Sequence, residues 1–225
     1  MRLFYVINVH EFETRLFGLR FSNRFLCALF AIAQCLFVVA SFVQHIYSWF
    51  RYRHVFFCRS NISYNATFEQ RFLAYDLVIF DFGLMHRILG TNECVANYLD
   101  GGYMRCSWCI QHAGALSLLL VAVGCMPTPI WLLWPALFMQ SSYVLGMSIL
   151  TMATMPKLLE AFSGFVDHQL GTAFIIYAAG FSLNWLFTFI LWHYYWGIEA
   201  KYSNNTSGIE KSIPAEEGEP HPEPV

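Results

Sequence analysis

Charged side chains are scarce in this sequence, and their scarcity indicates the class of protein. Only 12% of the 225 residues are Asp, Glu, Lys or Arg, whereas ordinary soluble domains carry about 25%. The stretch from Ile110 to Pro156 contains none of the four. Hydrophobic residues, in contrast, make up 57% of the chain. Because such a chain would aggregate in water, the composition excludes an ordinary soluble domain and predicts an integral membrane protein.

The sequence also lacks the features of several functional classes. No short cleavable apolar segment precedes the first long apolar run, so we expect no signal peptide. The net charge is −2, and the basic residues are scattered, which argues against a nucleic-acid partner. We find no Gly-rich phosphate loop, no assembled pair of acids and no nucleophile elbow. We therefore expect no cofactor and no metal, and we favour a protein that is not an enzyme.

The uncharged runs are long enough to cross a hydrocarbon core, which requires roughly 20 apolar residues. Phe25–Phe50 and Gly171–Gly197 each fit one span. The run 110–156 fits two, because Pro127 and Pro129 cannot continue a helix. We predict an all-α membrane protein, a four-transmembrane-helix bundle without buried carboxylates or fixed positive charges. The expected spans are 25–49, 110–126, 130–154 and 171–196.

The loop 51–109, between the first and second spans, is predicted to lie outside the cytoplasm. Asn61-Ile62-Ser63 and Asn65-Ala66-Thr67 place two glycosylation acceptors, Asn61 and Asn65, in tandem. The loop also contains an even number of cysteines, which suits an oxidising compartment. These cysteines are Cys58, Cys94, Cys106 and Cys109.

Both ends of the chain are accordingly predicted to lie in the cytoplasm. Residues 1–24 form a short N-terminal tail, whereas residues 198–225 form an acidic, proline-rich tail that we expect to be disordered. Asn204 and Asn205 are acceptors in that second tail, and we expect them to be unmodified. The protein is therefore expected to be a multi-pass protein of the plasma membrane or an endomembrane.

Cys106-Ser107-Trp108-Cys109 is the motif with the most chemical potential. It precedes the second span, and the partial positive charge of a helix N-terminus favours the thiolate of a nearby cysteine. The arrangement distantly resembles vitamin K epoxide reductase, in which the CxxC opens the last span. The resemblance implies thiol–disulfide exchange between this motif and Cys58 and Cys94.

A structural role for the same four cysteines is the simpler interpretation. Two disulfides would staple an outer loop that is too small to build a large core of its own. Three connectivities are possible, and the sequence does not choose among them. A zinc site at Cys106, Cys109 and His112 lacks a second ligand pair at the usual spacing.

Polar and small residues within the spans predict how the helices pack. His45, His112 and His193 lie towards span ends, where we expect them to reach headgroup water. Deeper neutral groups suit interhelical hydrogen bonds, and these are Gln34, Gln44, Gln140, Ser141, Ser142 and Asn184. Small-residue pairs mark faces for close helix approach, within the bundle or against a partner. These pairs are Ala113 and Ser117, Ser142 and Gly146, and Ala178 and Ser182.

The segment Thr67–Gly90 is unusually apolar for a loop. Its apolar residues recur at helix-like spacing, which predicts an amphipathic helix on the membrane surface or a lid over the bundle. The run Leu77-Val78-Ile79-Phe80 also fits a strand.

The arrangement of spans and loops resembles the broad animal four-span (tetraspan) class, including claudin-like junction proteins and pasiflora-type proteins. The end of the fourth span, from Asn184-Trp185-Leu186-Phe187 to Trp192-His193-Tyr194-Tyr195, is similar to the last span of lysosome-associated four-span proteins. The claudin first-loop signature and the Cys-Cys-Gly motif of true tetraspanins are absent. The resemblance implies lateral assembly or cell contact at a membrane.

We therefore predict a non-enzymatic four-pass membrane protein that organises partner proteins or cell contacts, as a junction or scaffold protein does. Its expected partners are the lipid bilayer and either other membrane proteins or further copies of itself. Two alternatives stay open. One is a membrane thiol–disulfide oxidoreductase that uses Cys106 and Cys109, and the other is an accessory subunit of a channel or transporter.

Overall fold

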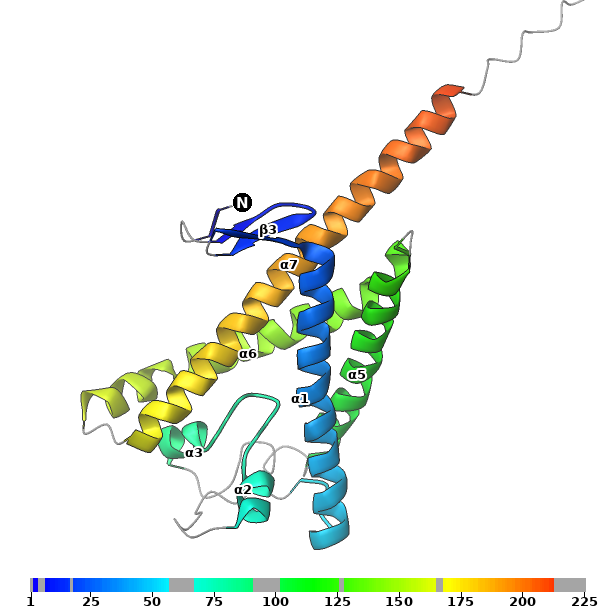
Figure 1. The fold of residues 1–225 in the computed structure, drawn as a ribbon. Coiled ribbons are helices and arrows are strands. Elements are labelled where there is room, and N and C mark those ends of the chain that lie inside the picture. The colour runs from blue at the N-terminus through cyan, green and yellow to red at the C-terminus, as the bar shows by residue number, and fades with distance from the viewer. Residues whose placement is uncertain are drawn as a thin grey trace, which may run out of the picture.

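Four long helices form most of the protein. The computed structural model describes residues 2–3, 7–16, 18–56, 67–90, 102–125, 128–164 and 168–212. The long helices are α1 (Asn23–Tyr52), α5 (Tyr103–Gly124), α6 (Trp134–Ser163) and α7 (His168–Ser212), shown in Figure 1. Each is long and apolar enough to cross a membrane. Of the predicted all-α four-helix bundle, a mostly helical chain with four helices of spanning length is therefore confirmed, whereas a small N-terminal sheet departs from the all-α class.

The helices pack as a closed ring in which α1 contacts α5 and α7, and α6 contacts the same two helices. Figure 1 shows the pairs α1/α5 and α6/α7 diverging towards the lower end of the view. The interior is filled by large apolar side chains that are less than 2% exposed, namely Leu116, Leu119, Leu133, Leu137, Phe187, Ile190 and Leu191.

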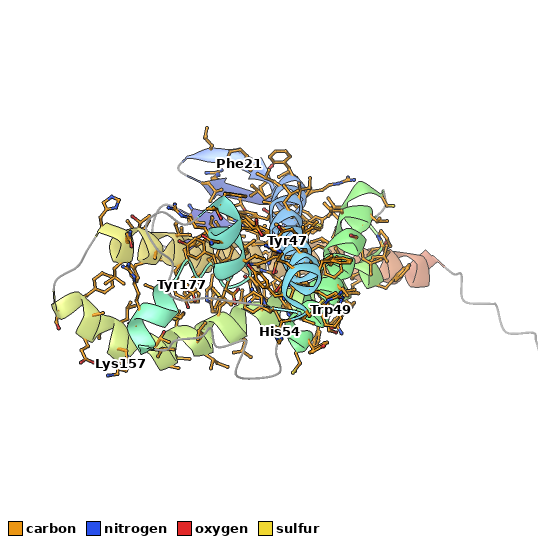
Figure 2. All side chains as sticks on the ribbon, turned by 90° about the horizontal axis from the view of Figure 1, so that it is seen from below. Phe21, Tyr47, Trp49, His54, Lys157 and Tyr177 are labelled. Atoms are coloured by element: carbon orange, nitrogen blue, oxygen red, sulfur yellow. The ribbon has the colours of Figure 1, made fainter. Side chains whose placement is uncertain are left out.

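Large apolar side chains also cover the outside of the bundle. More than half of the surface of each is exposed for Leu36, Phe138, Leu145, Ile149, Ile175 and Leu183. Figure 2, which looks at the molecule from below, shows Lys157 at the periphery and Tyr177 towards the interior. Such an apolar exterior is costly in water and suits a hydrocarbon solvent.

The start of α5 and the end of α6 differ most clearly from the predicted boundaries of the second and third spans. α5 begins at Tyr103, before the expected start at 110, because a charged residue ends an apolar run without ending a helix. Gly102, at φ 92°, provides the left-handed turn that precedes the helix. α6 extends beyond 154 and contains Pro156.

The predicted disorder from residue 198 onward is wrong for residues 198–212, which continue α7. This segment contains good helix formers such as Glu199 and Lys201. The proline-rich composition that predicted disorder begins only at Pro214, and residues 213–225 lie outside the described part of the chain.

The N-terminal tail is folded, which the sequence analysis did not anticipate. Its strands are β1 (Arg2–Leu3), β2 (Ile7–Val9), β3 (Glu13–Leu16) and β4 (Leu19–Ser22). They form an antiparallel sheet in chain order, which lies against α7 and the start of α1 in Figure 1.

The side chain of Asn23 fixes this sheet to the bundle. Its Nδ2 donates to the carbonyl oxygens of His10 (2.6 Å) and Glu11 (3.1 Å). Its Oδ1 accepts a hydrogen bond from the Thr14 hydroxyl (2.5 Å). Because Asn23 and Thr14 are both fully buried, the turn between β2 and β3 has a fixed position on α1.

The connection between α5 and α6 includes Pro129, one of the two prolines of the predicted break. A short 3₁₀ helix, η1 (Ile130–Leu132), precedes α6. Thr128 in this connection is tied to α7, because its hydroxyl lies 3.1 Å from the Tyr194 hydroxyl and its carbonyl accepts from Tyr202 (3.1 Å). The predicted helical hairpin is therefore present.

The apolar segment 67–90 is neither one helix nor a strand. It contains α2 (Phe68–Ala74) and α3 (Leu84–Leu89), with a tight turn between them. α2 begins at a capping box in which Thr67 and Gln70 exchange hydrogen bonds. Gln44 on α1 donates to the carbonyl oxygens of Phe72 (2.5 Å) and Tyr75 (2.6 Å), and so holds the end of α2 on the bundle.

Candidate functional site: an inserted loop held by a buried ion pair

The turn between α2 and α3 enters the bundle from its lower end. Asp76 and Asp81 exchange two backbone hydrogen bonds of 3.0 and 2.9 Å, which close the neck of a loop whose tip is the four residues 77–80. Figure 1 shows this loop rising between the diverging helix pairs. Phe80 at its tip has φ 55°, a left-handed conformation that is uncommon for a bulky residue. We call residues 76–81 the inserted loop.

The tip of the inserted loop contacts three of the long helices. The Phe80 ring packs edge-on against Phe37 of α1, with 5.4 Å between ring centroids. It also covers Gly180 of α7, where an added Cβ would lie 2.4 Å from the Phe80 ring. The Tyr143 hydroxyl of α6 donates to the carbonyl oxygen of Val78.

The tip of the inserted loop lies deep within the bundle. Phe37 lies near the middle of α1, so non-helical backbone reaches the level of a spanning helix's midpoint. In a bilayer such backbone is tolerated only where protein or a water-filled cavity surrounds it. Here three helices enclose it, in the manner of a re-entrant loop.

A buried ion pair secures the neck. Arg105, in the first turns of α5, makes a bidentate contact with the Asp76 carboxylate. The two side chains are only 11% and 6% exposed. The guanidinium also lies 4.4 Å from the centroid of the Phe56 ring, and the Ile79 backbone N–H donates to Asp76 Oδ1 (3.1 Å).

This ion pair corrects the prediction that no span contains a fixed charge. The error follows from the predicted start of the second span at 110, since the helix begins at 103 and includes Arg105. Ionisable residues inside a membrane protein are rare and mark functional regions. The partner of Arg105 could not be identified from the sequence, because Asp76 lies in a loop 29 residues away.

The two aspartates at the neck have different surroundings. Asp81 Oδ1 accepts the backbone N–H of Met85 at the start of α3 (3.1 Å). Burial raises the pKa of the Asp81 carboxyl, and hydrogen bonds from the backbone of α3 oppose that rise. Among the described residues no ion pair involves Asp81, and Arg105 forms its ion pair with Asp76 alone.

Buried polar side chains continue from the ion pair into the bundle. His45 Nδ1 donates to the Ser41 carbonyl oxygen (2.5 Å), and its ring stacks on Phe56 with 5.4 Å between centroids. The Cys109 thiol lies 3.7 Å from the Ser41 hydroxyl. His112 lies between the Trp108 and Tyr143 rings, at centroid distances of 4.3 and 5.5 Å.

The prediction that His45 and His112 reach headgroup water is wrong, since both are only 1% exposed. They face the interior because α1 and α5 continue beyond the predicted span ends. His193, at the other end of the bundle, is half-buried and donates from Nδ1 to the Phe189 carbonyl oxygen (2.8 Å).

The two cysteines of the CxxC motif lie one helical turn apart on α5. Cys106 and Cys109 are free thiols, and Cys109 is fully buried. Cys58 and Cys94, and likewise the acceptors Asn61 and Asn65, lie outside the described residues. The disulfide and glycosylation predictions therefore stay predictions. In the part of the chain that the structure describes, no group of three His, Cys, Asp or Glu could hold a metal ion.

A second polar network joins three helices beside the tip of the loop. Gln34 and Gln140 both donate from Nε2 to Asn184 Oδ1, at 3.0 and 3.2 Å. Asn184 Nδ2 donates to the Gly180 carbonyl oxygen (2.8 Å). The prediction of interhelical hydrogen bonds is confirmed for Gln34, Gln140 and Asn184, whereas Ser142 is exposed. Trp192 adds a bond to the Ser141 hydroxyl (3.1 Å).

The predicted small-residue faces point outward. Ser117, Ser142, Gly146 and Ser182 are exposed, and Ala113 and Ala178 are half-buried. An added Cβ at Gly146 would have nothing within 4 Å. Close packing inside the protein occurs instead at two other glycines. Gly180 packs against the Phe80 ring of the inserted loop, and Gly197 packs against the Phe12 ring of the β2–β3 turn. A search for paired small residues does not detect such glycines.

Comparison with known proteins gives a family without a described activity. A family model, that of a family of unknown function (DUF8774), matches residues 6–203. No curated protein and no solved structure matches the chain. The matched range contains the inserted loop, all four spans and both polar networks.

Proposed function

Since the chain belongs to this family of unknown function, DUF8774, we propose from its structure that it is a non-enzymatic four-pass membrane protein that organises partner membrane proteins. The observation that carries the proposal is the outward face of α6, which we call the α6 face. It consists of the exposed residues Phe138, Ser142, Leu145, Gly146 and Ile149.

The α6 face has the shape that favours a close helix contact. Ser142 and Gly146 form a shallow strip, one helical turn apart, flanked by the large side chains Phe138, Leu145 and Ile149. Small residues allow two helix backbones to approach, and the large neighbours supply van der Waals contact. Nothing in the described structure occupies the strip at Gly146.

The buried side of α6 fixes the direction of this face. Gln140 bonds to Asn184, and the Tyr143 hydroxyl bonds to the inserted loop. Both contacts hold one side of the helix towards the interior, so that Ser142 and Gly146 stay outside. The inserted loop thus supports the proposed function by orienting the partner-binding helix.

The alternative of a thiol oxidoreductase gains no support from the geometry. A catalytic CxxC needs one thiol that reaches a client disulfide and a second that resolves the mixed disulfide; Cys106 is half-buried, and Cys109 is fully buried beside Ser41. An accessory subunit of a channel or transporter would use the same lateral contact, and the identity of the partner distinguishes it from a scaffold.

Gly146→Leu is expected to weaken the partner complex without unfolding the protein. The new side chain fills the strip and should cost about 1–3 kcal/mol of association free energy, equivalent to a roughly 5- to 150-fold weaker complex. Native gels of the protein in mild detergent would show a shift from the complex to the monomer.

Gly114→Leu is the matched control for this experiment. Gly114 is also exposed on a spanning helix, and an added Cβ there has nothing within 4 Å. This variant should leave the complex intact. If Gly146→Leu also leaves the complex intact, the α6 face contacts lipid alone and the proposal fails.

We also propose that the end of the bundle with the β-sheet faces the cytoplasm. Phe56 and Thr67, which flank the sequons of Asn61 and Asn65, lie at the opposite end from Asn204. In animal cells, glycan should therefore attach at Asn61 or Asn65 and be lost in the Asn61→Gln, Asn65→Gln variant. A glycosidase-sensitive mass shift that survives in this variant and requires Asn204 or Asn205 would reverse the orientation.

A further inference from the structure

A pocket with charges of both signs lies at the sheet end of the bundle, apart from the α6 face. Its volume is about 620 Å³, and it is lined by residues of the β2–β3 region and of α7. Its polar lining consists of His10, Glu11, Glu13, Arg15 and His193, and Phe12 and Trp196 are its aromatic lining. We call it the sheet pocket.

The walls of the sheet pocket are held firmly. The turn between β2 and β3 is bound to the buried Asn23 at the start of α1. The same turn rests on α7 at Gly197, where an added Cβ would lie 2.9 Å from the Phe12 ring. Lys201 on the next turn of α7 covers Phe12, with its Nζ 4.0 Å from the ring centroid.

The pocket lies at the level where the spans end. Arg24, at the start of α1, donates to the Val123 carbonyl oxygen at the end of α5 (2.7 Å). Tyr194 on α7 meets Thr128 in the connection between α5 and α6. If the four helices cross a bilayer, this level is the headgroup region, where an exposed Trp such as Trp196 is typical.

The charges of the sheet pocket are not satisfied by one another. Glu11, Glu13 and Arg15 are exposed, and none takes part in an ion pair within the described ranges. Arg15 is also directly opposite Arg20 in the β3–β4 register. Like charges opposite each other are destabilising, so an anion beside them would be stabilising.

The two signs of charge define the class of ligand. Glu11 and Glu13 would repel a purely anionic ligand, and Arg15 would repel a purely cationic one. A ligand that carries a phosphate and an ammonium group satisfies both. Because Nδ1 of His193 is taken up by the Phe189 carbonyl oxygen, Nε2 is the ring nitrogen that remains to contact a ligand in the pocket.

We propose that the sheet pocket binds the headgroup of a phosphatidylethanolamine-type lipid. Arg15 contacts the phosphate, and Glu11 and Glu13 accept hydrogen bonds from the primary ammonium. His193 Nε2 supplies a further contact, and the Trp196 ring supplies a cation–π surface. A quaternary ammonium has no N–H to donate, and an additional carboxylate on the ligand would meet Glu11 and Glu13.

Lipid retention by the full-length protein tests this proposal. The protein would be taken from vesicles of equal parts phosphatidylethanolamine, phosphatidylcholine and phosphatidylglycerol, and its bound lipid identified by native mass spectrometry. We expect about a tenfold preference for phosphatidylethanolamine. Arg15→Gln should reduce that retention about tenfold, whereas the double variant Glu11→Gln, Glu13→Gln should abolish the preference over phosphatidylcholine.

The control variant is Glu160→Gln, which removes an exposed carboxylate on α6 outside the sheet pocket and should change nothing. Equal retention of the three lipids, or a preference for phosphatidylglycerol, would overturn the proposal. Free phosphoethanolamine provides the last arm. If it competes at the same concentration as the lipid, the ligand is the soluble compound and the lipid assignment is wrong.

Discussion

Asp76→Asn is expected to lower the free energy of unfolding by about 3–5 kcal/mol, because it leaves Arg105 charged and unpaired inside the protein. The pair is bidentate and both side chains are largely buried, so water does not replace the lost partner. The Asp76 carboxylate also closes the neck of the inserted loop through Ile79. Reversible unfolding in mixed micelles would measure the loss.

Asp81→Asn provides a matched control at the same neck. The new amide oxygen still accepts the Met85 N–H, and no ion pair among the described residues depends on the charge of Asp81. We expect a loss below about 1 kcal/mol. Similar losses for the two variants would show that the ion pair contributes nothing beyond a backbone contact.

A double-mutant cycle separates charge from packing. Removing both charges with Asp76→Leu and Arg105→Met should recover most of the stability lost by either single change, because apolar replacement of a buried ion pair is often neutral or stabilising. If the double variant is as unstable as the sum of the two single variants, the pair is not coupled.

The four spans could be predicted from the sequence because the helix faces that would meet lipid must be apolar. Leu36 and Phe138 are examples of such outward residues, and they extend the uncharged runs that hydropathy detects. The hydrogen bonds of the deep neutral residues could be predicted as well, since Gln34 and Asn184 have few partners in a membrane other than each other.

The sheet and the inserted loop could not be obtained by the same reasoning. The alternating runs 13–16 and 19–22, on either side of Gly18, contain a hairpin signal, but their location before the first span suggested a simple tail. The inserted loop is apolar for a different reason, since Val78 and Phe80 contact protein at depth rather than lipid. Hydropathy does not distinguish these two kinds of burial.

Gly180→Val is expected to displace the inserted loop from the bundle. A Cβ at this position would lie 2.4 to 2.9 Å from atoms of the Phe80 ring, and that ring packs on its other side against Phe37 of α1. Overpacking of this kind costs about 1–3 kcal/mol, and the loop relieves it by leaving its site. Labelling of Ile79→Cys with a membrane-impermeant maleimide would become much faster.

Two further variants test whether the contact between Gly180 and Phe80 holds the loop in place. Gly146→Val makes the same chemical change on a spanning helix where nothing lies within 4 Å, so labelling at position 79 should stay slow. Adding Phe80→Ala to Gly180→Val removes the ring that the new side chain meets, and slow labelling should return. Fast labelling in the Gly146 variant, or no rescue by Phe80→Ala, would mean that the contact between Phe80 and Gly180 does not hold the loop. Rescue would instead show that Gly180 on α7 leaves the space in which the Phe80 ring packs, and that this contact holds the inserted loop in the bundle.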